Sequence, residues 1–281
     1  MATRKSLPVT GFGLLGMTWR PKVTPDERAF PAMKAAIANG ATIWSSSSIY
    51  GMAPEEPTAG LSLLRRYFTK YPEDAEKVTL FIRACMDGKT LTQACTRDGV
   101  RASAENAITI RKAHAICPLS VVEVEFSLWS TDILTNGVAS ACKELGVPIL
   151  TYAPLGYGFL TGQVRKLEDI PKGDIRHMFG RFQPEHFPKN LELVDKVNEF
   201  AKQKSITPAQ VALAWIRAHS NTEKCGTIIP IPGATEAKRV DENCKVIELS
   251  AEEKARLDNI LESIPVSGGR QIAGLESQLW G

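Results

Sequence analysis

Short apolar runs alternate with longer segments that repeat apolar residues at helical spacing along most of the chain. Short runs rich in β-branched residues predict strands, and the longer periodic segments predict helices. The expected strands are residues 9–15, 41–44, 78–83, 121–126, 148–152 and 227–231. The expected helices are residues 25–39, 59–71, 138–145, 191–204, 208–219, 236–244 and 251–264. A loop-rich segment, residues 156–189, separates two of these groups.

Residues that favour helix ends support several of these boundaries. Thr24 and Thr207 are expected to cap the helices that follow them, and Gly40 is expected to end the first. Ser250 is followed three residues later by Glu253, the spacing of a capping box. The third strand is apolar without interruption, VTLFI, so we expect it to be covered on both faces.

The alternation of strand and helix predicts parallel strands joined by crossover helices. The chain has 281 residues, which fits one α/β barrel domain spanning residues 1–281. Gly11, Gly13 and Gly16 form a G-x-G-x-x-G pattern, which occurs in dinucleotide-binding doubly wound sheets. That pattern requires a helix directly after it, whereas residues 17–25 include Trp19 and two prolines and predict a loop. The sequence therefore favours a barrel.

Composition excludes several classes of protein. Hydrophobic residues make up 43% and charged residues 23%, as in ordinary globular proteins. A net charge of +3 is too small to indicate nucleic-acid binding. The N-terminus lacks the apolar core of a signal peptide, and no apolar run is long enough to span a membrane. The six cysteines form no C-x-x-C pair, so we expect free thiols in a reducing compartment, the cytoplasm.

Several segments together resemble the aldo-keto reductase family, especially its fungal and yeast pyridoxal reductase-like branch. The resemblance covers nearly the whole chain. The segments that carry it are FGLLGMTWRP (12–21), WSSSSIYG (44–51), TYAPLGYGFLTG (151–162), GRFQPEHFPKNLELV (180–194), TPAQVALAWIRA (207–218) and IPIPGATEAKRVDEN (229–243). It implies a (β/α)8 barrel that reduces a carbonyl compound, an aldehyde or a ketone, with NADPH as the cofactor.

The resemblance also implies where the cofactor would lie. Barrel enzymes hold phosphate at loops after the last strands and at a helix N-terminus. By resemblance Arg239 would bind the 2′-phosphate, Glu242 and Asn243 the adenine, and Tyr152 the nicotinamide. Arginine suits this role because its planar guanidinium matches phosphate. The other positions implied to contact NADPH are Gly16, Met17, Ser45, Glu123, Leu155, Gly156, Gly233, Ala234 and Thr235.

The catalytic positions of the family are only partly retained. The family uses a tyrosine as proton donor beside a lysine that is paired with an aspartate, and a histidine orients the substrate. Tyr50 matches the tyrosine, but Arg83 stands at the lysine position and Ser45 at the aspartate position. Arg83 keeps the positive charge and would polarise Tyr50. His114 lies within a predicted helix and does not match the family's histidine.

The sequence also lacks a stretch of the family's barrel. No strand-like run occurs between Cys85 and Val121, so the chain offers about six strands where the family has eight, and roughly fifty residues are missing against a typical barrel. Residues 98–116 are expected to form one fused helix. Glu123 stands where many relatives have a glutamine that binds the carboxamide. An incomplete barrel must reclose or leave strand edges unpaired.

Three interpretations follow from these features. The chain is a working NADPH-dependent reductase, a non-catalytic NADPH-binding or scaffolding protein of the same fold, or a splice or gene-model variant that lacks a coding segment. The retained phosphate-binding motifs favour the first two, the altered catalytic residues favour the second, and a join within two helices favours the third. The sequence leaves the substrate and the oligomeric state open.

Overall fold

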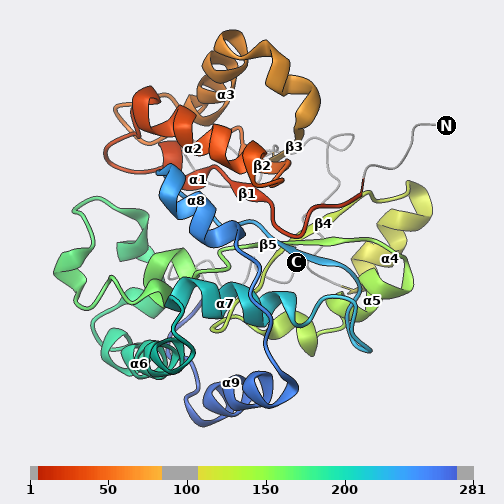
Figure 1. Ribbon diagram of the computed structural model, residues 1–281, viewed down its shortest axis with the longest axis vertical. Helices are drawn as coiled ribbons and strands as arrows, with labels where there is room; N and C mark the ends of the chain where they lie inside the picture. Colours follow the sequence, from red (N-terminus) through yellow and green to blue (C-terminus); the bar gives the residue numbers. More distant parts are fainter. Residues whose placement is uncertain (1–5, 84–106, 271–281) are drawn as a thin grey trace. The chain divides into compact units, whose positions relative to one another are not determined.

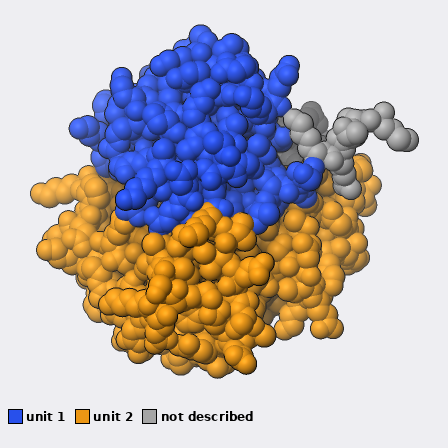
Figure 2. Space-filling model, viewed as in Figure 1, with its two compact units in different colours: residues 1–99, 229–244 blue, residues 100–228, 245–281 orange. Residues whose placement is uncertain are grey.

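The computed structural model describes residues 6–83 and 107–270. Its six strands form two three-stranded sheets, in the orders β1-β2-β3 and β4-β5-β6. The chain divides into two compact units (Figure 2). The first unit contains residues 1–99 and Ile229–Cys244, and the second contains Val100–Ile228 and Lys245–Gly281.

The first unit is a parallel sheet with helices around it (Figure 1). Its strands are β1 (Phe12–Gly13), β2 (Ile43–Ser47) and β3 (Thr79–Arg83). The amides of Gly11 and Gly13 donate to the carbonyls of Pro230 and Pro232, which return to this unit late in the chain. The helices are α1 (Leu15–Thr18), α2 (Asp26–Ala38), α3 (Ala59–Lys70), the 3₁₀ helix η1 (Pro72–Lys77) and α8 (Ala237–Cys244).

Apolar faces of these helices build the core of the first unit. α2 and α8 pack side by side, so a helix near the start of the chain contacts one from residues 237–244 (Figure 1). Trp44 on β2 is fully buried and lies against Phe12, Tyr67 and Phe68. Aromatic pairs of this kind add stabilisation beyond the area they bury.

The described part of the second unit contains five α-helices and five 3₁₀ helices. Strands β4 (Val122–Glu125) and β5 (Ile149–Tyr152) are parallel, and the Ile149 amide donates to the Thr227 carbonyl just before β6 (Ile228–Pro230). The α-helices are α4 (Ala107–Ile116), α5 (Val138–Glu144), α6 (Phe187–Lys204), α7 (Pro208–Arg217) and α9 (Ala251–Ser263). The 3₁₀ helices are η2 (Asp132–Leu134), η3 (Gly156–Thr161), η4 (Leu167–Asp169), η5 (Ile175–Met178) and η6 (Gly180–Phe182).

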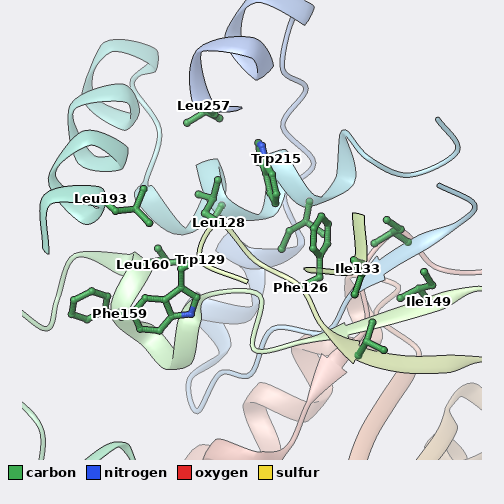
Figure 3. Close-up of a cluster of buried hydrophobic side chains, with 14 of the residues drawn as sticks. Phe126, Leu128, Trp129, Ile133, Ile149, Phe159, Leu160, Leu193, Trp215 and Leu257 are labelled. Carbon is green, nitrogen blue, oxygen red and sulfur yellow. The ribbon is translucent and has the colours of Figure 1, made fainter. Parts of the chain in front are cut away.

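One aromatic-rich core fills the second unit. Trp129 stacks on Phe159 with ring centroids 4.9 Å apart, and Phe126 lies 5.1 Å from Trp215 (Figure 3). Leu257 of α9 is fully buried in the same cluster. This core positions the two loops that follow β4 and β5.

The structure confirms the α/β class, the parallel strands and the six-strand count in the part of the chain that it describes. The caps at Thr207 and Ser250 are confirmed, and both form complete capping boxes. Gly40 follows the end of α2 with a left-handed φ of 73°. Cys117, Cys142, Cys225 and Cys244 are free thiols, as expected for the cysteines within the described ranges.

Several expected boundaries are wrong. The strand expected at residues 9–15 is only two residues long, because α1 begins at Leu15. α2 is preceded by Pro25 and has no side-chain cap, so Thr24 does not cap it. α6 begins at Phe187, four residues earlier than expected, because Pro188 stands in its first turn, where a missing amide costs nothing.

The third strand is not covered on both faces as its composition suggested. Leu80 and Ile82 on β3 remain 42% and 38% exposed. The apolar content of a strand shows that burial would be favourable but not which segment provides it. The residues that follow β3, 84–106, lie outside the described ranges, and so does the N-terminal half of the expected fused helix, of which α4 is the described part.

Candidate functional site

Tyr50 and Arg83 are brought together by the pairing of β2 with β3. Ser47 and Arg83, the last residues of the two strands, lie opposite each other in the parallel register. The Ser48 amide and the Ser47 hydroxyl both donate to the Arg83 carbonyl, at 2.9 and 3.1 Å. This fixes the turn that carries Tyr50, and the Arg83 Nη2 donates a hydrogen bond to the Tyr50 hydroxyl. A permanent positive charge therefore contacts the phenol oxygen.

The Tyr50 ring is held between two further groups. Trp19, which follows α1, stacks on it with centroids 5.5 Å apart and ring planes 26° apart. The Arg83 guanidinium carbon lies 5.7 Å from the ring centroid. Only 3% of Tyr50 is exposed, so the hydroxyl is in a largely desolvated setting. Sequence reasoning placed Trp19 in a loop, and no local pattern indicated this stacking.

The aspartate position of the family holds a small buried hydroxyl side chain. Ser45 is 2% exposed and lies on β2 opposite Phe81 of β3. Gly60 allows α3 to approach this strand, because a Cβ there would lie 3.0 Å from the Tyr50 Cβ and 3.2 Å from the Ser46 hydroxyl oxygen. The packing therefore leaves little space for a larger side chain near these residues.

Glycines and a charged helix form the other part of the first unit's candidate site. Gly233 makes a parallel bridge to Gly13, and a Cβ on Gly13 would lie 2.7 Å from the Ile231 carbonyl oxygen. Ala234 and Thr235 then lead into α8. Apart from its chain neighbours and its own helix, no described atom lies within 4 Å of the position a Cβ would take on Gly16, although the Gly16 carbonyl accepts from Arg20 Nη1 at 3.3 Å.

Arg239 projects from α8 with its side chain 43% exposed, and its guanidinium lies 4.0 Å from the Glu242 carboxylate. Glu242 is 20% exposed, whereas Asn243 is buried. Met17, which was also expected near the cofactor, is buried at 1% exposure. Arg239 is thus the accessible cation among these residues.

The remaining predicted site residues lie in the second unit. Glu123 pairs with Leu150 across the β4-β5 register, and Tyr152 ends β5. The chain then turns through Leu155 and Gly156, which precede the left-handed residues Tyr157 and Gly158. Gly156 is required at its position, because a Cβ would lie 2.8 Å from the Trp129 ring. The strand end and the glycine loop are therefore packed on the unit's aromatic core.

Glu125, two residues after Glu123, belongs to a buried charge cluster instead of an open site. Its carboxylate lies 3.8 Å from Arg181 and 3.4 Å from Arg270, and the side chains of all three are at most 11% exposed. Burial lowers the pKa of Arg181 despite the charge of Glu125. Breaking a buried pair of this kind costs about 3–5 kcal/mol, so the cluster is a structural tie between β4, η6 and the C-terminal segment.

We searched the described ranges for groups of metal ligands and for membrane-spanning helices. Residues 6–83 and 107–270 contain no group of three or more His, Cys, Asp or Glu side chains arranged to hold a metal ion. None of the helices described is long and apolar enough to cross a membrane.

Comparison with known proteins assigns the family. A sequence model of the Aldo/keto reductase family matches residues 102–262. The chain is also 32% identical to "Probable pyridoxal reductase 2" of Schizosaccharomyces pombe, over 96% of this chain and 96% of that protein. The chain belongs to the aldo/keto reductase family. The expected resemblance to its pyridoxal reductase-like branch is confirmed.

Solved structures of this family share the fold. The glycerol dehydrogenase AKR11B4 from Gluconobacter oxydans superposes with a TM-score of 0.70 at 16% identity, over 94% of this chain and 95% of that one. An aldo-keto reductase from Klebsiella pneumoniae, solved in complex with NADPH, gives a TM-score of 0.60 at 17% identity, over 93% and 92% of the two chains. The chain therefore shares the aldo-keto reductase fold, and six strands are found in its described residues.

The alignment with the yeast relative bears on the missing stretch. It extends over 326 positions, whereas this chain has 281 residues in total. The relative therefore has residues at positions where this chain has none, in agreement with the expected internal deletion.

Proposed function

We propose that this chain is an NADPH-dependent oxidoreductase that reduces an aldehyde or ketone, of pyridoxal-like or secondary-metabolite type. The contact between Arg83 and the Tyr50 hydroxyl is the observation that carries the proposal. A hydroxyl polarised by a fixed positive charge, in a desolvated setting, is a suitable proton donor to a carbonyl oxygen. Membership of a reductase family and similarity to a pyridoxal reductase support the same reaction.

Each unit, taken by itself, has features that fit a dinucleotide cofactor. In the first unit, there is open space where a Cβ on Gly16 would stand, Gly233 is exposed, and Arg239 offers an accessible guanidinium beside Glu242. In the second unit, Gly156 and Gly158 adopt left-handed conformations. Apart from neighbouring chain atoms, only the Arg176 Nη1 of the described residues lies within 4 Å of the position a Cβ would take on Gly158, which leaves space for a diphosphate at that residue. NADPH, when bound, supplies the hydride. We propose that Arg239 binds its 2′-phosphate, with Tyr152, Leu155, Glu123 and Asn243 among the further contacts.

Tyr50 and Arg83 have different roles in the proposed proton transfer. Tyr50 donates the proton to the carbonyl oxygen, and Arg83 holds the hydroxyl in position and stabilises the negative charge that develops on it. Ser45 cannot supply a carboxylate, but a guanidinium keeps its charge without one. The family's substrate-orienting histidine has no matched counterpart in the sequence. We therefore expect weak turnover of reactive aldehydes and little of hindered ketones, because loss of orientation can cost about 100-fold.

The decisive experiment measures NADPH oxidation with a panel of aldehydes for the unaltered chain and for Tyr50→Phe. General acid catalysis contributes about 10²–10⁴-fold, so Tyr50→Phe should lower kcat by at least about 100-fold. Tyr71→Phe is the matched control, because Tyr71 packs its ring on Phe30 and Tyr67, away from the Tyr50–Arg83 pair. Turnover that survives in Tyr50→Phe would place the chemistry elsewhere.

A second candidate function is a non-catalytic NADPH-binding or scaffolding protein. The observation that favours it is the buried Ser45 at the position of the family's aspartate. The same assay separates the two functions, because a scaffolding protein would bind NADPH and oxidise none of it with any aldehyde. A splice or gene-model variant is tested independently by sequencing the transcript across residues 107–110.

A further inference from the structure

The loop after β5 contains a bulky residue in a conformation that favours glycine. Gly156, Tyr157 and Gly158 have φ values of 57°, 55° and 89°, so three consecutive residues are left-handed. Glycine adopts this conformation at little cost, whereas a tyrosine there is uncommon and strained. Strain of this kind persists only where surrounding contacts hold it in place. The contacts around Tyr157 must therefore hold its backbone in the left-handed conformation.

Arg176 of η5 makes a polar contact to the strained residue. Its Nη1 donates to the Tyr157 carbonyl at 3.2 Å, and the same nitrogen lies 3.8 Å from the position a Cβ would take on Gly158. The Phe179 ring, three residues after Arg176, lies 4.8 Å from the Tyr157 ring. The segment 174–179 thus contacts both the backbone and the side chain of Tyr157.

Asp174 fixes the orientation of Arg176. The two side chains form a bidentate pair, with Nε and Nη2 of Arg176 each 2.9 Å from a carboxylate oxygen. The Asp174 carboxylate also accepts from the Arg176 backbone amide at 3.0 Å, as the N-cap of η5. The side chains are only 18% and 14% exposed. A bidentate pair with low exposure orients a guanidinium well, because both ends of the planar group are constrained.

We infer that Arg176 is a positioning residue: held by Asp174, it keeps the Tyr157 backbone left-handed and so shapes the Gly156–Gly158 loop for the diphosphate of a dinucleotide cofactor. The inference rests on the proposed function for the identity of the ligand. It differs from the role proposed for Arg239, because the diphosphate is common to NADPH and NADH, whereas the 2′-phosphate is not. Loss of Arg176 should therefore weaken both cofactors by the same factor.

The test compares the dissociation constants of NADPH and NADH, by fluorescence titration, in Arg176→Met, Arg176→Lys and Asp174→Asn. Arg176 bonds the Tyr157 carbonyl and not the cofactor, so its loss acts on affinity through the population of the left-handed loop. A bond from a charged donor shifts such a population by about tenfold, so Arg176→Met should weaken both cofactors by up to about tenfold. Arg176→Lys should retain part of the affinity. Arg165→Met is the control, since Arg165 pairs with Asp195 at 2.6 Å on the exposed surface of the same unit, and it should leave both constants unchanged.

Limited proteolysis with chymotrypsin gives a readout that needs no cofactor. Cleavage after Tyr157 or Phe159 should be faster in Arg176→Met than in the unaltered chain or in Arg165→Met. Each protein is digested at the same interval below its own melting temperature, so that global unfolding contributes equally. If Arg176→Met does not fold, Asp174→Asn and Arg176→Lys provide the same comparisons.

Three results would overturn the inference. Unchanged affinity for both cofactors in a folded Arg176→Met would do so, and so would a loss confined to NADPH, which would place Arg176 at the 2′-phosphate. If the unaltered chain binds neither dinucleotide, the proposed function fails, and proteolysis alone decides the role of Arg176. Cleavage unaffected by the substitution would then refute it.

Discussion

The arginine beside Tyr50 does not need a neighbouring carboxylate to keep its positive charge, whereas a lysine at the same position does. A lysine ammonium can lose its proton when it is buried, and a nearby carboxylate opposes that loss. An arginine remains protonated in proteins, so Arg83 needs no such support. Ser45 at the aspartate position is therefore compatible with a charged neighbour to Tyr50. Arginine in place of the lysine compensates for serine in place of the aspartate. The pair would still differ from the family's in geometry, because a planar group replaces a compact one.

The cofactor preference is testable at a single residue, Arg239. Its side chain is 43% exposed and its guanidinium lies 4.0 Å from the Glu242 carboxylate, and we predict that NADPH binds more tightly than NADH because of it. Arg239→Ala should remove the preference by weakening NADPH alone, at a cost of about 1.5–3 kcal/mol for a charged hydrogen bond. Fluorescence titration of both cofactors measures this. Lys238→Ala, one position earlier on the same helix, is the control, and equal affinities in the unaltered protein would refute the role.

Sequence reasoning found the residues whose roles follow from a motif and missed those whose roles follow from packing. Tyr50 and Arg83 could be proposed because their positions match family motifs, and the structure then brought them into contact. Trp19 and Arg176 could not be found this way. Trp19 meets Tyr50 across 31 positions of the chain, and Arg176 meets Tyr157 across 19, so no local pattern encodes either contact.

Three elements of the first unit meet at one buried carboxylate. Asp74 of η1 accepts hydrogen bonds from Tyr67 of α3 at 2.7 Å and from Lys77 at 2.9 Å, and it lies 2.6 Å from Lys34 of α2. Burial of this carboxyl would raise the pKa of Asp74, but the bonds from Lys34, Lys77 and Tyr67 outweigh it and lower the pKa to about 2. The ionised carboxylate therefore ties α2, α3 and η1 together.

The Asp74 cluster predicts a loss of stability in acid. Because the pKa of Asp74 is lower in the folded chain than its usual value of 3.8, its contribution is complete above about pH 5 and is lost as the pH falls toward 2. Asp74→Asn should lower the free energy of unfolding at pH 7 by about 1.5–3 kcal/mol, the worth of a charged hydrogen bond. Urea titrations between pH 7 and 3 measure both effects.

The difference between Asp74→Asn and the unaltered chain should shrink as the pH is lowered. Glu199→Gln, which removes an exposed carboxylate paired with Lys196, should cost far less at every pH. A constant difference across the pH range would contradict the assignment of the acid sensitivity to Asp74.

The secondary-structure elements were predictable where a local signal defines them. Thr207 and Ser250 sit at the start of periodic helices with Gln210 and Glu253 three residues later, and both capping boxes form. The environment of β3 was not predictable, because the exposure of Leu80 and Ile82 depends on what packs on the strand from elsewhere. The short 3₁₀ helices within residues 156–189 were also missed, since single turns carry no periodicity.

At the scale of the whole molecule, each compact unit has a core of its own, yet the chain crosses between the units repeatedly. Residues 1–99 are followed by the larger part of the second unit, and Ile229–Cys244 then return to the first. Val240 of α8 is 2% exposed in the core that contains Leu63 and Trp44, so that core is completed only by this late segment. The first unit is therefore not a contiguous piece of sequence.

This connectivity leads us to propose that residues 1–281 unfold as one cooperative domain. Leu63→Ala in the first core and Leu257→Ala in the second each remove a large buried side chain, at about 2–5 kcal/mol. Both should lower the midpoint of the same thermal transition, with calorimetric and van't Hoff enthalpies equal, because α8 completes the first core and is joined at both ends to chain of the second unit. Scanning calorimetry of the three proteins measures this. Two separate transitions, each moved by only one of the substitutions, would show instead that the units are independent domains.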